Sequence, residues 1–224
     1  GEDDFYCLHP KTRKLLNHQK ARIDLLFDLI NGAKTPRTSL LEAYMLRLEV
    51  FPMIKALERF RPPRDRTAFE YMIMDSFSEL TDQKFTHNVE GWSFCCHYSD
   101  IAHTSEFDRE FTCDGLLPID KIYASYDAFF EWFGHTYPGK KIIYIHYSSQ
   151  FDPRDSFKKR QVVIEEAMLA LRAKYSFLCN IQPASDIFIK SRLDDLPYHY
   201  APKTISAISA LIQNQFQGNN NVPS

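Results

Sequence analysis

The chain has 224 residues, of which 44% are hydrophobic and 25% are charged, and it carries 18 Phe, 12 Tyr and 2 Trp. This is ample material for one large domain or for a core with a helical appendage. The formal charge of -2 excludes a general attraction to nucleic acid or to anionic lipid. The seven glycines spell neither G-x-G-x-x-G nor a P-loop, which excludes the usual dinucleotide and phosphate-binding loops.

Two helical patterns occupy the N-terminal part of the sequence. Apolar residues recur at intervals of three and four over residues 10–30 and again over residues 39–60, which is the period of a helix that buries one face. Pro52 interrupts the second pattern and predicts a kink or a split there. Pro62-Pro63 then marks a boundary, so we expect a helical N-terminal segment over residues 1–65.

Strand patterns alternate with helical patterns after this boundary. The predicted strands lie at residues 69–74, 92–98, 141–147 and 177–181. The predicted helices lie at residues 118–133, 155–175 and 202–217. Alternation of this kind predicts an α/β fold over residues 66–217, a three-layer α/β/α sandwich with a mostly parallel sheet and residues 142–145 at its centre. Residues 218–224 are expected to be a flexible tail.

The sequence also bounds the environment of the protein. No apolar run approaches the roughly 18 residues of a membrane helix, and residues 2–4 are acidic where an export signal would be basic. The five cysteines lack C-x-x-C spacing. His87, His97, Asp100 and His103 match no regular metal-ligand template. We therefore expect a cytoplasmic protein with no membrane span, nucleic-acid partner, disulfide framework, metal or cofactor.

Two polar segments are candidates for chemistry at the carboxyl ends of the strands, where such sheets bind ligands. Ser76 directly follows the first buried strand, and a serine there can act as a nucleophile beside backbone N–H groups. Asp195 and His199 lie in the loop before the last helix, where a carboxylate can orient an imidazole for general-base work. The residues predicted to bind substrate in the same cleft are His146, Asp152 and Tyr198.

Each candidate has a structural alternative. Asp75-Ser76 is also a favoured N-cap for the helix that follows a strand. Asp195 and His199 are also compatible with an ordinary polar linker that contains a proline. His146 is also compatible with a buried, hydrogen-bonded histidine of the core.

These motifs resemble those of the SGNH (GDSL-type) hydrolase superfamily. The likeness rests on D-S-x-S after a buried strand, and on Asp then His immediately before the last amphipathic helix of the sandwich. The run from Lys140 to Tyr200 is similar to the divergent branch of bacterial polysaccharide gene clusters. Members of the superfamily are esterases, lipases and carbohydrate O-acyltransferases or deacylases with a flavodoxin-like α/β/α fold.

The resemblance implies a hydrolase or transferase of polysaccharide biosynthesis, either an esterase or an O-acetyltransferase, that acts on an acyl ester of a carbohydrate. Ser76 would be its nucleophile, His199 its base and Asp195, or else Asp194, the residue that orients His199. The chain departs from the family pattern at Met74, where the family has glycine, and by one extra residue between Asp195 and His199. The family's G-x-N-D block is absent.

An alternative register makes residues 72–85 the second strand of the family fold, and the chain then lacks the nucleophile block. The second hypothesis is therefore a non-catalytic or degenerate SGNH-like module for carbohydrate binding or assembly. The many apolar residues of the first two helical patterns predict, in addition, contact with a second copy of the chain or with an upstream domain. Packing of these residues within the chain is the alternative.

Overall fold

The computed structural model describes residues 20–62, 69–193 and 198–217. The chain forms two compact units, each assembled from segments that lie far apart in the sequence. The described residues of the parallel-sheet unit are 71–76, 141–193 and 198–217, and those of the antiparallel-sheet unit are 20–62, 69–70 and 77–140. The units are therefore discontinuous in sequence, whereas the proline boundary predicts the contiguous ranges 1–65 and 66–217.

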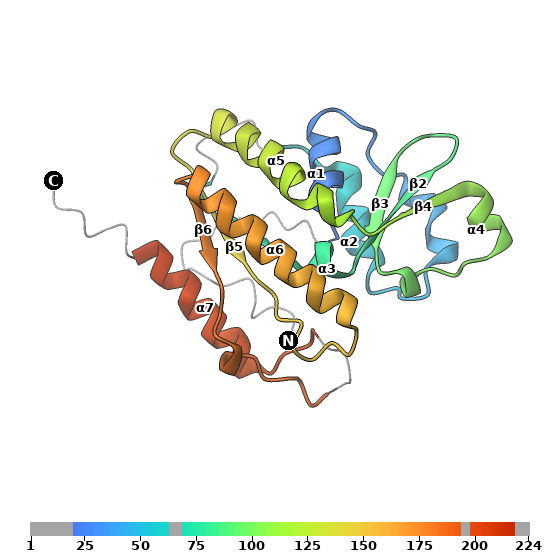
Figure 1. Ribbon diagram of the computed structural model, residues 1–224. Helices are drawn as coiled ribbons and strands as arrows, with labels where there is room; N and C mark the ends of the chain where they lie inside the picture. Colours follow the sequence, from blue (N-terminus) through green and yellow to red (C-terminus); the bar gives the residue numbers. More distant parts are fainter. Residues whose placement is uncertain (1–19, 63–68, 194–197, 218–224) are drawn as a thin grey trace. The chain divides into compact units, whose positions relative to one another are not determined.

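A parallel three-stranded sheet forms the centre of the parallel-sheet unit (Figure 1). Strand β5 (Lys141–Ile145) lies between β1 (Tyr71–Asp75) and β6 (Leu178–Ile181) and pairs in parallel with both. Helix α6 (Asp155–Lys174) joins β5 to β6, and α7 (Pro202–Gln217) follows the loop after β6. The structure confirms the mixed α/β class and the central position of β5 in this sheet.

Packing within this unit explains why β5 reads as an unbroken apolar run. Residues 142–145 are all buried, as expected for a parallel strand covered on both faces. Ile143 shares an apolar cluster with Ile208 of α7. Asn180 of β6 donates a 2.8 Å hydrogen bond from Nδ2 to the carbonyl oxygen of Met168 in α6.

The predicted starts of two helices agree with the structure. Pro202 is the first residue of α7, where its fixed φ suits a helix and its missing N–H costs nothing. Asp155 is the first residue of α6, where a carboxylate interacts favourably with the helix dipole. These local signals survive because they depend on the chain immediately around them.

The second sheet is antiparallel and belongs to the other unit. Strand β2 (Gln83–His87) pairs with β3 (Ser93–Cys96) and with β4 (Phe111–Gly115), both in antiparallel orientation. The predicted strand at residues 92–98 therefore exists but lies in this sheet. Polar residues interrupt the apolar pattern of β2 and β4, which is why neither was predicted. The mostly parallel sheet predicted over residues 66–217 describes only one of the two sheets.

The α-helices of the antiparallel-sheet unit are α1 (Ile23–Ile30), α2 (Phe51–Ala56), α3 (Phe77–Thr81), α4 (Ser105–Glu110) and α5 (Ile122–Thr136). Its short 3-10 helices are η2 (Thr38–Leu40), η3 (Glu42–Tyr44), η4 (Leu57–Arg59), η5 (Tyr98–Asp100) and η6 (Ile119–Lys121), and η7 (Ser185–Ile187) lies in the parallel-sheet unit. The helix predicted over residues 39–60 is thus broken into short turns and α2. Pro52 lies in the first turn of α2, so it starts a helix and does not kink one. Of the helix predicted over residues 10–30, α1 covers the last part, and residues 10–19 lie outside the described residues.

Aromatic side chains supply much of the core of the antiparallel-sheet unit. Phe85, Trp92, Phe94, Phe107 and Phe111 all belong to one buried cluster. The ring centroids of Phe107 and Phe111 lie 4.8 Å apart, and those of Phe85 and Phe94 lie 5.2 Å apart. Contacts at these separations add to the stabilisation from burial alone. The high aromatic content of the chain is therefore used for packing here.

Several of the N-terminal apolar residues considered for an interface are buried inside the antiparallel-sheet unit, and others are half-buried there. Leu25, Leu29, Leu41 and Leu57 are buried there, whereas Leu48 is exposed. Packing within the chain thus accounts for most of this apolar surface. Contact with a second copy or an upstream domain stays a prediction.

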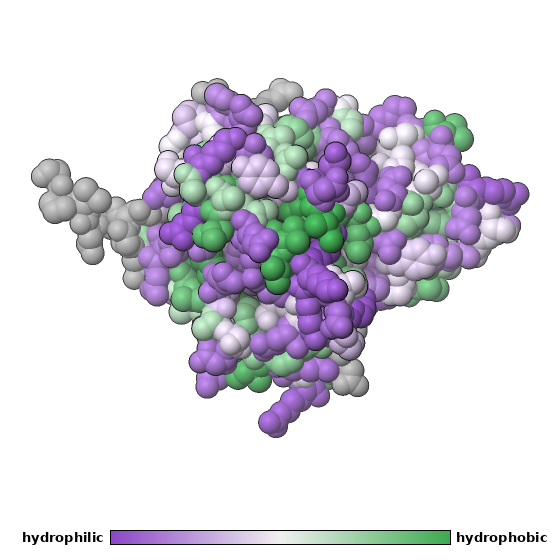
Figure 2. All heavy atoms as spheres, in the orientation of Figure 1, coloured by the Kyte–Doolittle hydropathy of each residue, from purple (hydrophilic) through white to green (hydrophobic). Residues whose placement is uncertain are grey.

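Hydrophilic side chains cover much of the face shown in Figure 2, with hydrophobic side chains between them. Within the described ranges, none of the helices is both long and apolar enough to cross a membrane. The same residues contain no group of three or more His, Cys, Asp or Glu side chains that could hold a metal ion. The four described cysteines are free thiols.

A buried ion pair links the start of the described chain to the turn after α3. Lys20 Nζ donates to Asp82 Oδ1 at 3.0 Å, and the two side chains are 9% and 0% exposed. Thr81 Oγ1 donates to the same carboxylate oxygen at 3.1 Å. Asp82 is therefore the main compensation for the buried ammonium group.

We expect Asp82→Ala to lower the free energy of unfolding by about 3–5 kcal/mol, because the Lys20 ammonium group would stay buried without its partner. Denaturant unfolding measures the change. Asp120→Ala removes an exposed carboxylate and should change stability by no more than about 0.5 kcal/mol. Equal stabilities of the two variants would contradict the assigned role of the ion pair.

Candidate functional site

A pocket opens at the carboxyl edge of the parallel sheet. Its described lining residues come from the loop after β5, from α6, and from the segment after β6. They are His146, Ser148, Gln161, Glu165, Gln182, Pro183, Ala184, Ser185 and Phe188. The pocket volume of about 440 Å³ lies within the range of about 300–1,000 Å³ that is typical of small-molecule sites. Parallel sheets bind ligands at this edge.

His146 directly follows β5 and lines the pocket while being only 3% exposed. Its ring packs against Tyr144 with the centroids 5.0 Å apart. Burial lowers the pKa of His146 to about 4, because desolvation disfavours the imidazolium ion. The Nδ1 atom is buried and has no hydrogen-bond partner among the described residues. The imidazole is therefore uncharged at neutral pH and has unused hydrogen-bonding capacity beside a cavity, whereas a core histidine would normally be satisfied.

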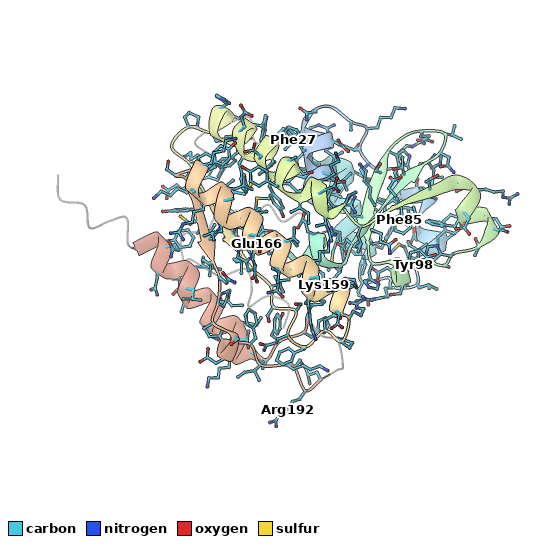
Figure 3. The ribbon with its side chains drawn as sticks, viewed as in Figure 1. Phe27, Phe85, Tyr98, Lys159, Glu166 and Arg192 are labelled. Atoms are coloured by element: carbon cyan, nitrogen blue, oxygen red, sulfur yellow. The ribbon has the colours of Figure 1, made fainter. Side chains whose placement is uncertain are left out.

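Two polar residues of α6 form one wall of the pocket. The Ser149 amide donates to Gln161 Oε1 at 2.6 Å, and Gln161 Nε2 donates to Glu165 Oε1. Gln161 and Glu165 are four residues apart and so lie on the same side of the helix. In Figure 3, Lys159 and Glu166 are labelled on the same helix, and both are exposed. The hydrogen-bonded chain fixes the orientation of the Glu165 carboxylate.

The loop that carries His199 is anchored on both sides of this residue. Tyr198 donates its hydroxyl proton to Asp152 Oδ2 at 2.9 Å, and Tyr200 donates to the carbonyl oxygen of Ser148 at 2.7 Å. Ser148 itself lines the pocket. The His199 side chain is exposed. The two tyrosines thus hold the backbone of His199 at the carboxyl edge of the sheet and leave its imidazole accessible.

Asp152 serves as the buried end of one anchor. Arg154 donates to it from Nε at 2.9 Å and from Nη2 at 2.7 Å, which is a bidentate pair. Burial by itself would raise the pKa of Asp152, but the hydrogen bonds from Arg154 and Tyr198 outweigh burial and hold the pKa below its usual value. Burial and the Asp152 carboxylate in turn raise the pKa of Tyr198. Asp152 stays ionised and Tyr198 stays protonated, so the anchor persists through the neutral range.

Ser76 ties the end of β1 to the end of β5. Its amide donates to the carbonyl oxygen of Ile145 at 3.2 Å, and its Oγ accepts a 2.9 Å hydrogen bond from the Tyr147 amide. The residue is only 1% exposed. Among the described residues, Ser76 makes these two hydrogen bonds and none to His199. The hydroxyl therefore extends the pairing of two strands past their ends.

Four of the six predicted site residues lie at the carboxyl edge of the parallel sheet, either in the lining of the pocket or in the loops joined by the two tyrosine hydrogen bonds. They are His146, Asp152, Tyr198 and His199. Ser76 lies at the same edge, but its hydroxyl is buried and accepts a hydrogen bond from the Tyr147 amide. Asp195 lies outside the described residues, so its predicted role stays a prediction.

Sequence reasoning did not find Gln161, Glu165, Gln182 and Ser185, which line the pocket. A usable signal exists for the first two, since they are polar residues four apart near the middle of the crossover helix after β5. Gln182 and Ser185 carry no such signal. They reach the pocket because the chain turns there after β6.

Comparison of the chain with protein-family models, with curated proteins and with solved structures found no match. The site thus contains three different side chains. His199 is exposed, His146 is buried and neutral with a ring nitrogen that has no partner among the described residues, and the Ser76 hydroxyl accepts a hydrogen bond from the Tyr147 amide.

We expect Ser76→Ala to lower the free energy of unfolding by about 1–3 kcal/mol, because the Tyr147 amide would lose its acceptor in a partly buried position. Thermal and denaturant unfolding measure this. Ser206→Ala, at an exposed position on α7, serves as the matched control and should be within about 0.5 kcal/mol of the wild type. If the two variants are equally stable, the bond to Tyr147 does not hold the strand ends together.

The pKa of His146 predicts a component of pH-dependent stability. The folded chain has this pKa near 4 and the unfolded chain near 6.5, so the unfolded chain binds more protons between these values. The contribution is fully present above about pH 6.5 and is lost as the pH falls toward 4. We expect His146→Phe to weaken the fall of Tm between pH 7 and 5, while His135→Phe, at an exposed position, leaves it unchanged. A fall of Tm that is identical in all three proteins would show that His146 does not titrate in this way.

Proposed function

We propose that the parallel-sheet unit is an SGNH-like module that binds an acylated carbohydrate in the pocket at the carboxyl edge of its sheet. The observation that carries this proposal is the buried, neutral and incompletely hydrogen-bonded His146 in a polar cavity beside the anchored His199 loop. Hydroxyl groups of a sugar can use the polar lining residues as partners, and Phe188 adds an apolar surface for a sugar ring or an acyl group.

Contacts within the unit support the finer fold assignment, a three-layer α/β/α sandwich of SGNH type. Ile143 packs with α7, and Tyr144, its neighbour in β5, points to the opposite face. Asn180 pairs in register with Tyr144 and bonds to α6. Helices that cover opposite faces of a parallel sheet are the defining feature of such a sandwich.

The geometry of Ser76 favours binding over catalysis. A serine nucleophile needs a hydroxyl that a substrate can reach and a base within about 3 Å. The Ser76 hydroxyl is buried and accepts the Tyr147 amide proton, so in this arrangement it has a structural task. This supports the non-catalytic form of the SGNH-like module.

Ester hydrolysis or acyl transfer is the second candidate, and the exposed, doubly anchored His199 favours it. In that mechanism Ser76 Oγ attacks the acyl carbonyl carbon while His199 takes its proton. The sugar alcohol then leaves with that proton, and water or another hydroxyl group releases the acyl group from Ser76. Asp195 would orient His199. Ser76 would first have to give up its hydrogen bond to the Tyr147 amide.

Binding is tested with methyl β-D-glucopyranoside and its 6-O-acetyl ester, followed by isothermal titration calorimetry on the full chain. We expect saturable binding of the ester, weakened by about tenfold or more in His146→Phe, because the substitution removes the polar imidazole of the pocket. His135→Phe should bind as the wild type does. If neither the glucoside nor its ester shows saturable binding, the proposal is overturned.

Catalysis is tested separately with a fluorophosphonate probe and mass-spectrometric mapping of the labelled residue. The buried hydroxyl predicts no label on Ser76. A label on Ser76 that is lost in His199→Ala, without a change in Tm, would instead establish the second candidate. The variant should fold normally because the replaced imidazole is exposed.

A further inference from the structure

The side chains that line the pocket differ in charge from those of a typical anion site. Of the nine described lining residues, Glu165 is the one with a carboxylate, and none is Lys or Arg. Arg154, which lies in the loop between β5 and α6, is engaged by the Asp152 carboxylate through two hydrogen bonds. The described lining therefore carries negative charge, and it includes no Lys or Arg that would compensate this charge.

The Glu165 carboxylate is oriented and still has capacity for a ligand. Its Oε1 accepts a hydrogen bond from Gln161 Nε2. Gln161 Oε1 in turn accepts one from the Ser149 amide. Among the described residues, Oε2 makes no hydrogen bond. A carboxylate held on one oxygen and open on the other is a strong acceptor for a hydroxyl or ammonium group.

His146 does not offset this charge. Burial keeps its imidazole neutral at neutral pH. A neutral imidazole can accept one hydrogen bond and donate another, so it suits the hydroxyl group of a ligand. The lining thus combines a fixed negative charge with neutral polar groups.

We propose that this pocket selects uncharged sugars and amino sugars and discriminates against anionic sugars, with the Glu165 carboxylate as the specificity-determining group. This inference rests on the proposed binding of a carbohydrate and adds the class of sugar. A hydroxyl or ammonium group donates to Glu165 at little cost. A uronic acid or a sugar phosphate would place a second negative charge beside it, and like charges this close in a partly desolvated site repel strongly.

The test measures the affinities of the full chain for four sugars of similar size, by isothermal titration calorimetry at neutral pH. They are methyl β-D-glucopyranoside, glucosamine, glucuronic acid and glucose 6-phosphate. We expect the first two to bind at least about tenfold more tightly than the last two. Glu165→Gln keeps the size and the hydrogen-bonding capacity of the side chain but removes its charge. The substitution should reduce the ratio of the affinities for methyl glucoside and glucuronic acid by about tenfold, and it should weaken the binding of glucosamine.

Glu166→Gln is the matched control, because Glu166 is the next residue on α6 and is exposed; it should leave all four affinities unchanged. If the anionic sugars bind as tightly as the neutral ones, or if Glu165→Gln and Glu166→Gln have equal effects, the assigned selectivity is overturned while carbohydrate binding stands. If none of the four sugars binds but the 6-O-acetyl ester does, the assigned selectivity is overturned while the proposed function stands. If the ester also fails to bind, the proposed function itself fails.

Discussion

The parallel pairing of β5 with β1 and β6 is the constraint on which the candidate site depends. Parallel strands end at the same edge of a sheet, so the segments that follow β5 and β6 emerge side by side. The chain must also return between them, and α6 makes that return. This helix adds Gln161 and Glu165 to the pocket residues that come from the segments after the strands.

Buried hydrogen bonds hold this edge in shape. Ser76 closes the end of β1 onto β5, and Tyr198 and Tyr200 fasten the last loop to the loop after β5. Tyrosine suits this task because its ring packs in an apolar environment while its hydroxyl reaches a polar partner. With these groups satisfied, the His146 Nδ1 atom still has no hydrogen-bond partner within the described part of the chain. An unsatisfied buried nitrogen costs free energy, and such groups are concentrated where a protein binds or reacts.

The elements of the parallel-sheet unit were predictable because each has a strong local pattern. β5 is a short apolar run, α6 and α7 have a helical period with a clear start signal, and β6 is a β-rich stretch after a helix. The antiparallel-sheet unit was predicted less well. Its strands β2 and β4 contain polar residues on a face that is not part of the core, and their pairing depends on residues distant in the sequence. The prediction of a single helix over residues 39–60 was wrong, because short turns that pack on an aromatic cluster can also bury periodic apolar residues.

The sequence by itself determined the α/β class, the central strand of the parallel sheet and the position of the segments that contain His146 and His199 at the carboxyl edge of that sheet, since these follow from periodicity and strand order. Only the tertiary structure decided that residues 77–140 belong to a separate antiparallel unit, that the Ser76 hydroxyl is occupied by a backbone amide, and that α6 supplies a carboxylate to the pocket. Local patterns specify which face of an element is buried. They do not specify which distant backbone group will reach a given side chain, and the chemistry of this site depends on that.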